Sequence, residues 1–131
     1  MLSFRRYIEE SVTDPFSREK TGRKKIDDML KNPKKYGVEA EVKIMTIKAL
    51  QNAMAKGQKI TVQKAYDKRM KMGGRKKVDN LKDLIKSGTK IDMPILDYAP
   101  GGFVQDGFHR ALAAQELGIK KIPVAVIKRK R

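Results

Sequence analysis

Cysteine is absent from this chain of 131 residues, and histidine occurs once, as His109. The lack of cysteine excludes disulfide bonds, thiolate zinc sites and a thiol nucleophile. A single histidine excludes a histidine-rich metal site, so a bound metal would need carboxylates or a bound phosphate as ligands. The chemistry left to the chain is that of carboxylates, amines, guanidinium groups and one imidazole.

Tryptophan is absent too, and no apolar run approaches the roughly 20 residues of a membrane span. Aromatic residues make up only 6% of the chain, so the core is expected to be aliphatic and of the size that one domain allows. The N-terminal residues lack the apolar region of a signal peptide. We therefore expect a soluble, cytoplasmic protein that binds no membrane.

Acidic residues are scarce relative to basic ones: 31 Lys and Arg stand against 15 Asp and Glu, a formal net charge of +16. Self-repulsion of this size is most easily tolerated when the partner is a polyanion. Nucleic acid, DNA ahead of RNA, is therefore the expected partner, and an anionic membrane surface ranks second on charge alone. The alternative is a lysine-rich surface that serves only solubility.

The chain divides into an N-terminal extension and a main domain. Residues 1–39 are expected to form a helical and basic extension, with short helices over 2–10 and 24–31. The polar segment 16–25 is expected to be a loop or a flexible arm. Residues 40–131 are expected to form the main domain.

The main domain alternates strand-like and helix-like segments. Thr46 and Thr61 are typical helix N-caps, and Gly118 is a typical helix end. The basic segment 71–77 is expected to be a flexible loop. The predicted fold class is α/β (α+β), a small mixed sheet with flanking helices. The expected strands cover 40–45, 93–98, 103–106 and 122–127, and the expected helices cover 47–56, 62–70, 78–85 and 109–117.

The most informative stretch, Asp106–Gly118, places His109 and Arg110 where a glycine turn leads into a helix. The N-terminus of a helix has unpaired N–H groups and a partial positive charge, which favour anions. His109 and Arg110 add two side chains suited to phosphate. The sequence therefore predicts an anion site at this turn.

Five separated motifs occur in one order over residues 75–128, and in that order they resemble the ParB/sulfiredoxin superfamily. The likeness is greatest to its stand-alone domains labelled ParB-like nucleases, many of which are phage-encoded. The motifs are Gly88 with Pro94-Ile95-Leu96, then Asp106-Gly107-Phe108-His109-Arg110, Ala113-Ala114, Leu117-Gly118 and Ile122-Pro123-Val124.

The resemblance implies a compact α/β fold in which the turn before the helix binds the phosphates of a nucleotide or a nucleic-acid backbone. Gly107 is the implied point of close backbone approach. The alternative is structural: His109 caps the helix or pairs with Asp106, and Arg110 stabilises the fold. The implied phosphate- or nucleotide-binding residues are Gly107, Phe108, His109, Arg110 and Pro94.

Two residues of the turn bear on catalysis. Asp106 is a candidate ligand for Mg²⁺ or Mn²⁺ and, with His109, a candidate catalytic residue. An aspartate before a glycine is equally typical of a turn. Sulfiredoxins carry a catalytic cysteine where this chain has Phe108, so sulfinic acid chemistry is excluded.

Basic residues concentrate in segments 18–25, 64–77 and 128–131. On a shared face they would follow a phosphate backbone without reading its sequence. The alternative for each is a solvated face. The candidate nucleic-acid-binding residues are Lys68, Arg69, Arg75, Lys76 and Lys77.

Three functions are open at this point. The leading one is a nucleic-acid-associated ParB-like domain that binds phosphate at the Gly-Phe-His-Arg turn, with metal-dependent nuclease activity as its extension. The second is a nucleotide-dependent phosphotransferase or NTPase that binds a nucleoside triphosphate there. The third is a non-enzymatic phage protein of the host cytoplasm that binds nucleic acid or an acidic host or viral protein. Whether the chain is an enzyme stays open.

Overall fold

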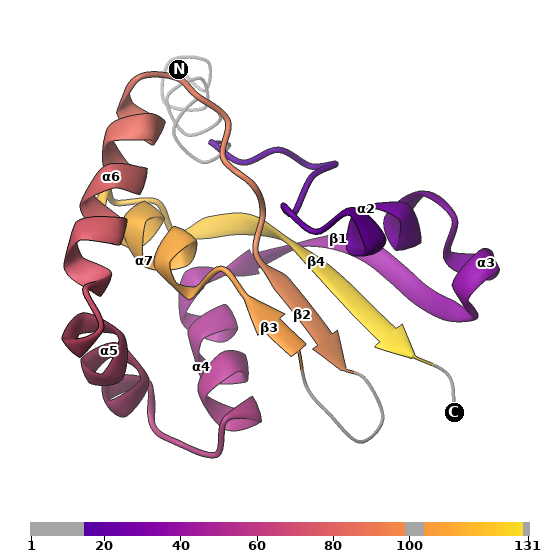
Figure 1. The fold of residues 1–131 in the computed structure, drawn as a ribbon, viewed down its shortest axis with the longest axis horizontal. Coiled ribbons are helices and arrows are strands. Elements are labelled where there is room, and N and C mark those ends of the chain that lie inside the picture. Colours follow the sequence, from indigo (N-terminus) through magenta and orange to yellow (C-terminus); the bar gives the residue numbers. More distant parts are fainter. Residues whose placement is uncertain (1–14, 99–103, 130–131) are drawn as a thin grey trace, which may run out of the picture.

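A computed structural model describes residues 15–98 and 104–129 (Figure 1). The helix expected over 2–10 and the turn expected over 99–102 lie outside the described residues. Among those described, no helix has both the length and the apolar character needed to cross a bilayer.

The sheet has four strands in the order β1-β4-β2-β3. The long strands β1 (Val38–Thr46) and β4 (Lys121–Arg129) are antiparallel, with nine consecutive residue pairs. Strand β2 (Ile95–Tyr98) is parallel to β4 and antiparallel to β3 (Val104–Asp106). The sheet is therefore mixed, and the predicted α/β class is confirmed.

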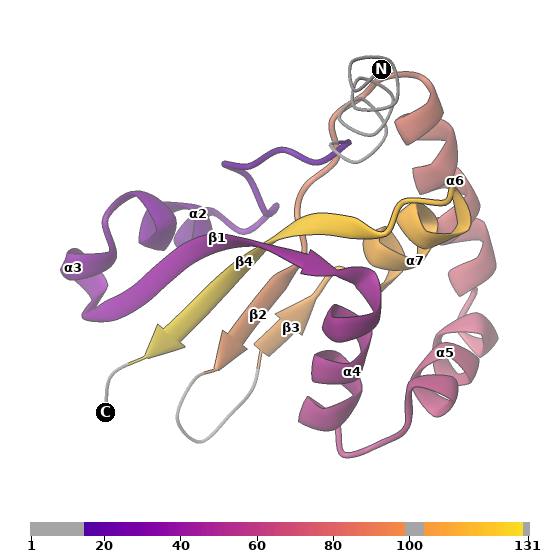
Figure 2. The ribbon, with the colours of Figure 1, turned by 180° about the vertical axis from the view of Figure 1, so that it is seen from behind.

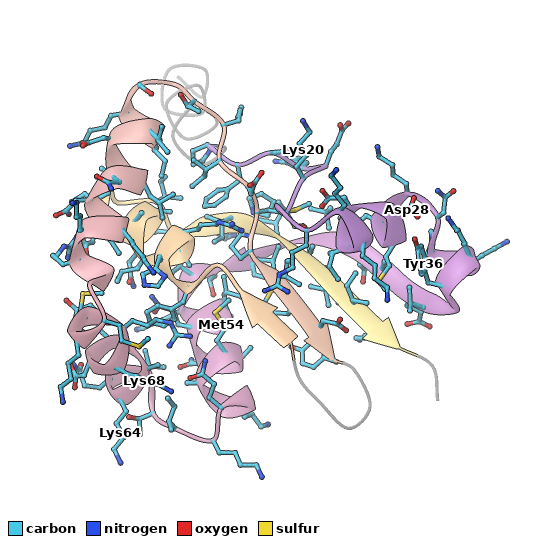
Figure 3. All side chains as sticks on the ribbon, in the orientation of Figure 1. Lys20, Asp28, Tyr36, Met54, Lys64 and Lys68 are labelled. Atoms are coloured by element: carbon cyan, nitrogen blue, oxygen red, sulfur yellow. The ribbon has the colours of Figure 1, made fainter. Side chains whose placement is uncertain are left out.

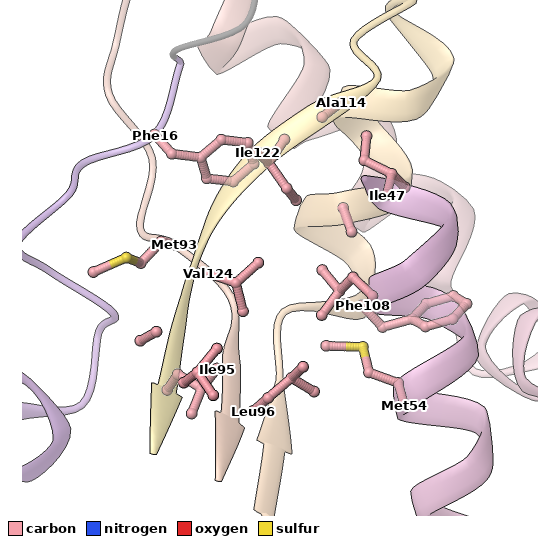
Figure 4. Packing of buried hydrophobic residues seen from close by; sticks show 14 of the residues in the cluster. Phe16, Ile47, Met54, Met93, Ile95, Leu96, Phe108, Ala114, Ile122 and Val124 are labelled. Atoms are coloured by element: carbon pink, nitrogen blue, oxygen red, sulfur yellow. The ribbon is translucent and has the colours of Figure 1, made fainter. Parts of the chain in front are cut away.

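Strand β4 is central, and its residues Ile122–Ile127 are buried without a break. Successive side chains of a strand point to opposite faces, so a continuous apolar run of this kind fits a strand covered on both faces. Figure 4 shows Phe108 and Met54 on the side of α4 (Ile47–Gly57) and α7 (Phe108–Glu116), and Phe16 on the side of the N-terminal segment. The core therefore lies on both faces of the sheet.

Two threonines begin helices as their sequence positions predict. Thr46 Oγ1 accepts a hydrogen bond from Ala49 N at 3.1 Å, and Thr61 Oγ1 accepts one from Lys64 N at 3.1 Å. Each bond satisfies one of the N–H groups that the first helical turn leaves unpaired. The remaining helices are α2 (Lys24–Lys31), α3 (Pro33–Tyr36), α5 (Val62–Lys71) and α6 (Gly74–Lys86).

The expectation of a flexible loop over 71–77 is wrong, because α6 already begins at Gly74. Gly73 adopts φ +80°, a left-handed conformation that turns the chain sharply between α5 and α6. A Cβ on Gly74 would lie 2.5 Å from the carbonyl oxygen of Arg69, so glycine lets the helices meet here. The pair of glycines therefore joins two helices closely.

The segment 16–25, expected to be a loop or a flexible arm, is irregular but anchored. Phe16 is 1% exposed and bridges to Ile91 in parallel, and Thr21 is fully buried. Phe16, Met29 and Val38 belong to the same core cluster as the residues of the main domain. The boundary expected at residue 39/40 is thus no break in packing, since β1 begins at Val38.

Helices α2 and α3 are joined by a polar cluster around Asp28. The Tyr36 hydroxyl donates to Asp28 Oδ2, and Asn32 and Lys35 donate to the same carboxylate at 3.3 Å each. These hydrogen bonds, first that of Tyr36, hold the pKa of Asp28 below its ordinary value. A depressed carboxyl pKa adds stability at neutral pH that is lost as the pH falls through the folded-state pKa.

We expect Tyr36→Phe to raise the pKa of Asp28 toward its ordinary value, because the principal donor is removed. At neutral pH the free energy of unfolding should then be lower in the variant than in the wild type. This difference should vanish in strong acid, where Asp28 is protonated in both the folded and the unfolded state. Carboxyl NMR titration and urea unfolding at several pH values measure both effects. Tyr66→Phe is the matched control, and an equal shift of Asp28 in that variant would contradict the assignment.

Candidate functional site

Gly107 is the N-cap of α7 and adopts φ +102°, a conformation that side chains rarely tolerate. A Cβ at this position would lie 2.7 Å from Cα of Pro94 and 2.8 Å from its Cβ. Pro94 directly precedes β2, is buried, and accepts a hydrogen bond from Ala125 N at 2.9 Å. The close approach at Gly107 is therefore to Pro94, and it fixes the start of α7 against the sheet.

We expect Gly107→Ala to destabilise the fold much more than Gly118→Ala. Both glycines have positive φ, but a Cβ on Gly118 meets nothing within 4 Å. Gly118→Ala should cost about 1–2 kcal/mol for the left-handed backbone alone, and Gly107→Ala about 1–3 kcal/mol more for the overlap with Pro94. Urea unfolding of the two variants decides the point, and equal losses would contradict it.

Phe108 points into the core and is only 3% exposed. The guanidinium carbon of Arg69 lies over its ring, 4.3 Å from the centroid, and Arg69 Nη1 donates to the carbonyl of Ala65 at 3.3 Å. Burial lowers the pKa of Arg69 from its ordinary value, although a guanidinium stays charged at neutral pH. Phe108 thus serves as the surface on which Arg69 stacks.

His109 is half-buried and lines a pocket of about 730 Å³. Four cationic side chains share that lining, and Figure 3 shows two of them, Lys64 and Lys68, along α5. No described carboxylate lines the pocket. The lining residues come from the α4–α5 turn, from α5 and the residue after it, from α6 and from α7. They are Gln58, Ile60, Lys64, Lys68, Arg69, Met72, Lys77 and His109.

Arg110 does not line this pocket. Its Nη1 donates to the carbonyl oxygens of Thr21 at 3.1 Å and Met93 at 3.3 Å. The two carbonyls belong to the N-terminal segment and to the chain before β2, so Arg110 joins both to α7. This placement favours the structural alternative for Arg110, while His109 faces the pocket.

We expect Arg110→Ala to lower the free energy of unfolding by about 1–3 kcal/mol, because two part-buried carbonyls lose a charged donor. The loss should be accompanied by faster amide exchange at Met93 N, which donates to Lys20 in the same segment. Lys48→Ala, an exposed change of the same charge on α4, is the control. Unchanged unfolding and exchange would show that these hydrogen bonds do not anchor the segment.

The candidate catalytic and metal-binding role of Asp106 stays a prediction. Its backbone pairs with Ile95 at the end of β3, and its side chain lies outside the described ones. Among the described side chains, which do not include that of Asp106, no three of His, Asp or Glu gather in a group that could hold a metal ion. Asp97 is fully buried in β2, away from the pocket lining.

Of the three consecutive basic residues in the first turn of α6, only Lys77 lines the pocket. Arg75 contacts Glu116 at 2.5 Å and Asp79 at 2.7 Å, and these carboxylates, Glu116 first, hold the pKa of Arg75 above its ordinary value. Lys76 is exposed and outside the lining. The structure therefore brings together His109, Lys68, Arg69 and Lys77, but neither Arg75 nor Lys76.

Four lining residues are absent from the predicted set. Lys64 and Met72 share a four-residue spacing with Lys68, and this spacing places all three on one face of a helix begun by Thr61. Hence their common face could have been found from the sequence. Gln58 and Ile60 enter from the α4–α5 turn, for which the sequence offers no such signal.

Comparison of the chain with family models, with curated proteins and with solved structures finds no match.

Proposed function

We propose that this protein binds the phosphate groups of a nucleic acid in the pocket that Lys64, Lys68, Arg69, Lys77 and His109 line. The observation that supports the proposal is the gathering of these side chains from three helices, with no described carboxylate among them. Like charges repel, so a pocket lined by cations is stabilised when an anion enters it. A phosphate backbone supplies several anions in a row.

Arg69 is held by two contacts of its own side chain. Stacking on Phe108 and the hydrogen bond to Ala65 hold its guanidinium in one orientation, so less side-chain freedom is lost when phosphate binds. Arginine also matches phosphate with paired N–H donors. The lysines are exposed and act as point charges along the rim.

Nucleic acid is favoured over a small anion by the charge of the whole chain. A net charge of +16 attracts a polyanion, which carries many phosphates, more strongly than it attracts a single phosphate. His109, in the first turn of α7, lines the pocket, and the ParB/sulfiredoxin resemblance implies phosphate binding at this turn. We also propose that the chain is related to that superfamily and that it prefers DNA to RNA. Contacts of this kind position a backbone and predict little dependence on base sequence.

The test is binding of a labelled DNA duplex over a range of salt concentrations. With four phosphate contacts, affinity should fall roughly a hundredfold between 50 and 200 mM salt. Lys64→Gln, Lys68→Gln and Lys77→Gln should each weaken binding and reduce the slope of log K against log[salt] by about 0.9.

Lys48→Gln carries the same charge change on α4, outside the pocket lining, and should leave the slope nearly unchanged. A slope that is insensitive to the pocket lysines but sensitive to Lys48 would place the contact elsewhere. A flat salt response in the wild type would refute phosphate binding and favour an acidic protein partner.

A second candidate, a free nucleotide, is favoured by the apolar residues of the same pocket. Ile60 and Met72 line it, and Met72 is 72% exposed, so a base has an apolar surface beside the cations. A labelled nucleoside triphosphate that binds more tightly than DNA, with loss of binding in Met72→Gln, would favour this function. Nuclease or phosphotransferase chemistry would need a base or a metal-holding carboxylate. His109 is the candidate base in the lining, and no described carboxylate lines the pocket.

A further inference from the structure

Strand β1 lies at the edge of the sheet, running from α3 to α4 (Figure 2). Within the described ranges its only strand neighbour is β4, so its other side presents backbone N–H and C=O groups to no strand. Its nine residues contain no glycine and no proline, and its register with β4 is continuous without a bulge. A long, regular edge of this kind is a template for pairing with another strand.

The net charge of β1 is opposite in sign to that of the chain as a whole. Two of its three charged residues, Glu39 and Glu41, are acidic, although basic residues outnumber acidic ones 31 to 15 overall. The third, Lys43, lies 3.4 Å from Glu41. Ile44 is 51% exposed, one of the large apolar side chains that the fold leaves in solvent. This edge is therefore unsuited to a polyanion and suited to a protein.

The sequence of β1 is complementary to itself about its midpoint, Val42. Antiparallel pairing centred there sets each residue i opposite residue 84 − i of a second copy, so the strand Val38–Thr46 overlaps with itself over its full length. Glu41 then stands opposite Lys43 of the second copy, and Lys43 opposite Glu41. Centring the pair on Glu41 or on Lys43 instead sets like charges face to face.

Apolar residues match in the same register. Ala40 stands opposite Ile44 of the second copy, so pairing covers the exposed Ile44 side chain on both copies. Cross-strand pairs of opposite charge and of apolar residues are the units that stabilise a sheet. One register thus satisfies backbone, charge and apolar contacts together.

We infer that two copies of this chain associate through β1 in antiparallel fashion, with the two-fold axis at Val42, to form one continuous eight-stranded sheet. An antiparallel edge pair keeps each face of the sheet on the same side in both copies. The layers of α4 and α7, and with them the two cationic pockets, therefore lie on one side of the dimer. The inference does not rest on the proposed function.

Sedimentation equilibrium and light scattering test this dimer with charge-reversal variants, at about 0.15 M salt, where charges more than about 8 Å apart are largely screened. Wild type should dimerise within the micromolar to near-millimolar range. Lys43→Glu and Glu41→Lys each set two like-charge pairs across the axis and should each weaken the dimer roughly tenfold. The double variant E41K/K43E restores both opposite-charge pairs and should regain the wild-type dimer.

A mixture of the two single variants provides the most specific outcome. The Glu41→Lys chain carries lysine at both positions and the Lys43→Glu chain carries glutamate at both, so each variant repels itself but is complementary to the other. The mixture should therefore form heterodimers at concentrations where each variant alone is monomeric. Lys48→Glu is the control with the same charge change as Lys43→Glu and should dimerise as the wild type does. Circular dichroism should show that all variants are folded.

Three results would overturn the inference. The first is a wild type that stays monomeric over the whole range. The second is a dimer that Lys43→Glu and Glu41→Lys leave unchanged, which would place the interface elsewhere. The third is a mixture of the single variants that stays monomeric while the wild type dimerises.

Discussion

The contact between Gly107 and Pro94 is the constraint on which the candidate site depends. Because Gly107 has no side chain, the first turn of α7 packs directly against Pro94, the residue before β2. Successive helical residues project about 100° apart, so a fixed first turn determines where the next three side chains go. Phe108 enters the core, His109 faces the pocket, and Arg110 reaches back to the N-terminal segment. The close contact at Gly107 thus determines where the side chains of the next three residues lie.

The distribution of charge around the pocket follows from which cations have a partner. Glu116, at the end of α7, binds both Arg75 and Lys82 of α6, at 2.5 and 3.2 Å. That network joins α6 to α7 on the exposed surface and holds Arg75 away from the lining of the pocket. Arg69 is balanced differently, by an aromatic ring and a carbonyl, neither of which carries a negative charge. The lining therefore keeps its positive charge for a ligand.

Local signals made much of the fold predictable. Threonine caps and apolar periodicity located α4 and α5, and the bounds expected for α2 match the structure. The prediction of a loop over 71–77 is wrong because two adjacent glycines are typical of a loop, whereas Gly74 allows close contact with the carbonyl of Arg69. For the site, Lys68, Arg69, Lys77 and His109 were among the predicted residues and converge. The bonds of Arg110 to Thr21 and Met93 span 89 and 17 residues of chain, and no local pattern encodes such a partner.

The positions of the acidic and basic residues explain how a chain of such high positive charge can both bind an anion and meet a second copy of itself. Repulsion between two copies is lowest where their local positive charge is lowest, and β1 carries two acidic residues and one basic residue. The cationic pocket is built from α5, α6 and α7, which follow β1 in sequence and occupy the other end of the molecule from α3 (Figure 1). In the inferred dimer, pairing through β1 turns both pockets toward the same side. A polyanion that entered one pocket would reduce the remaining repulsion between the copies, so anion binding and self-association are expected to strengthen each other.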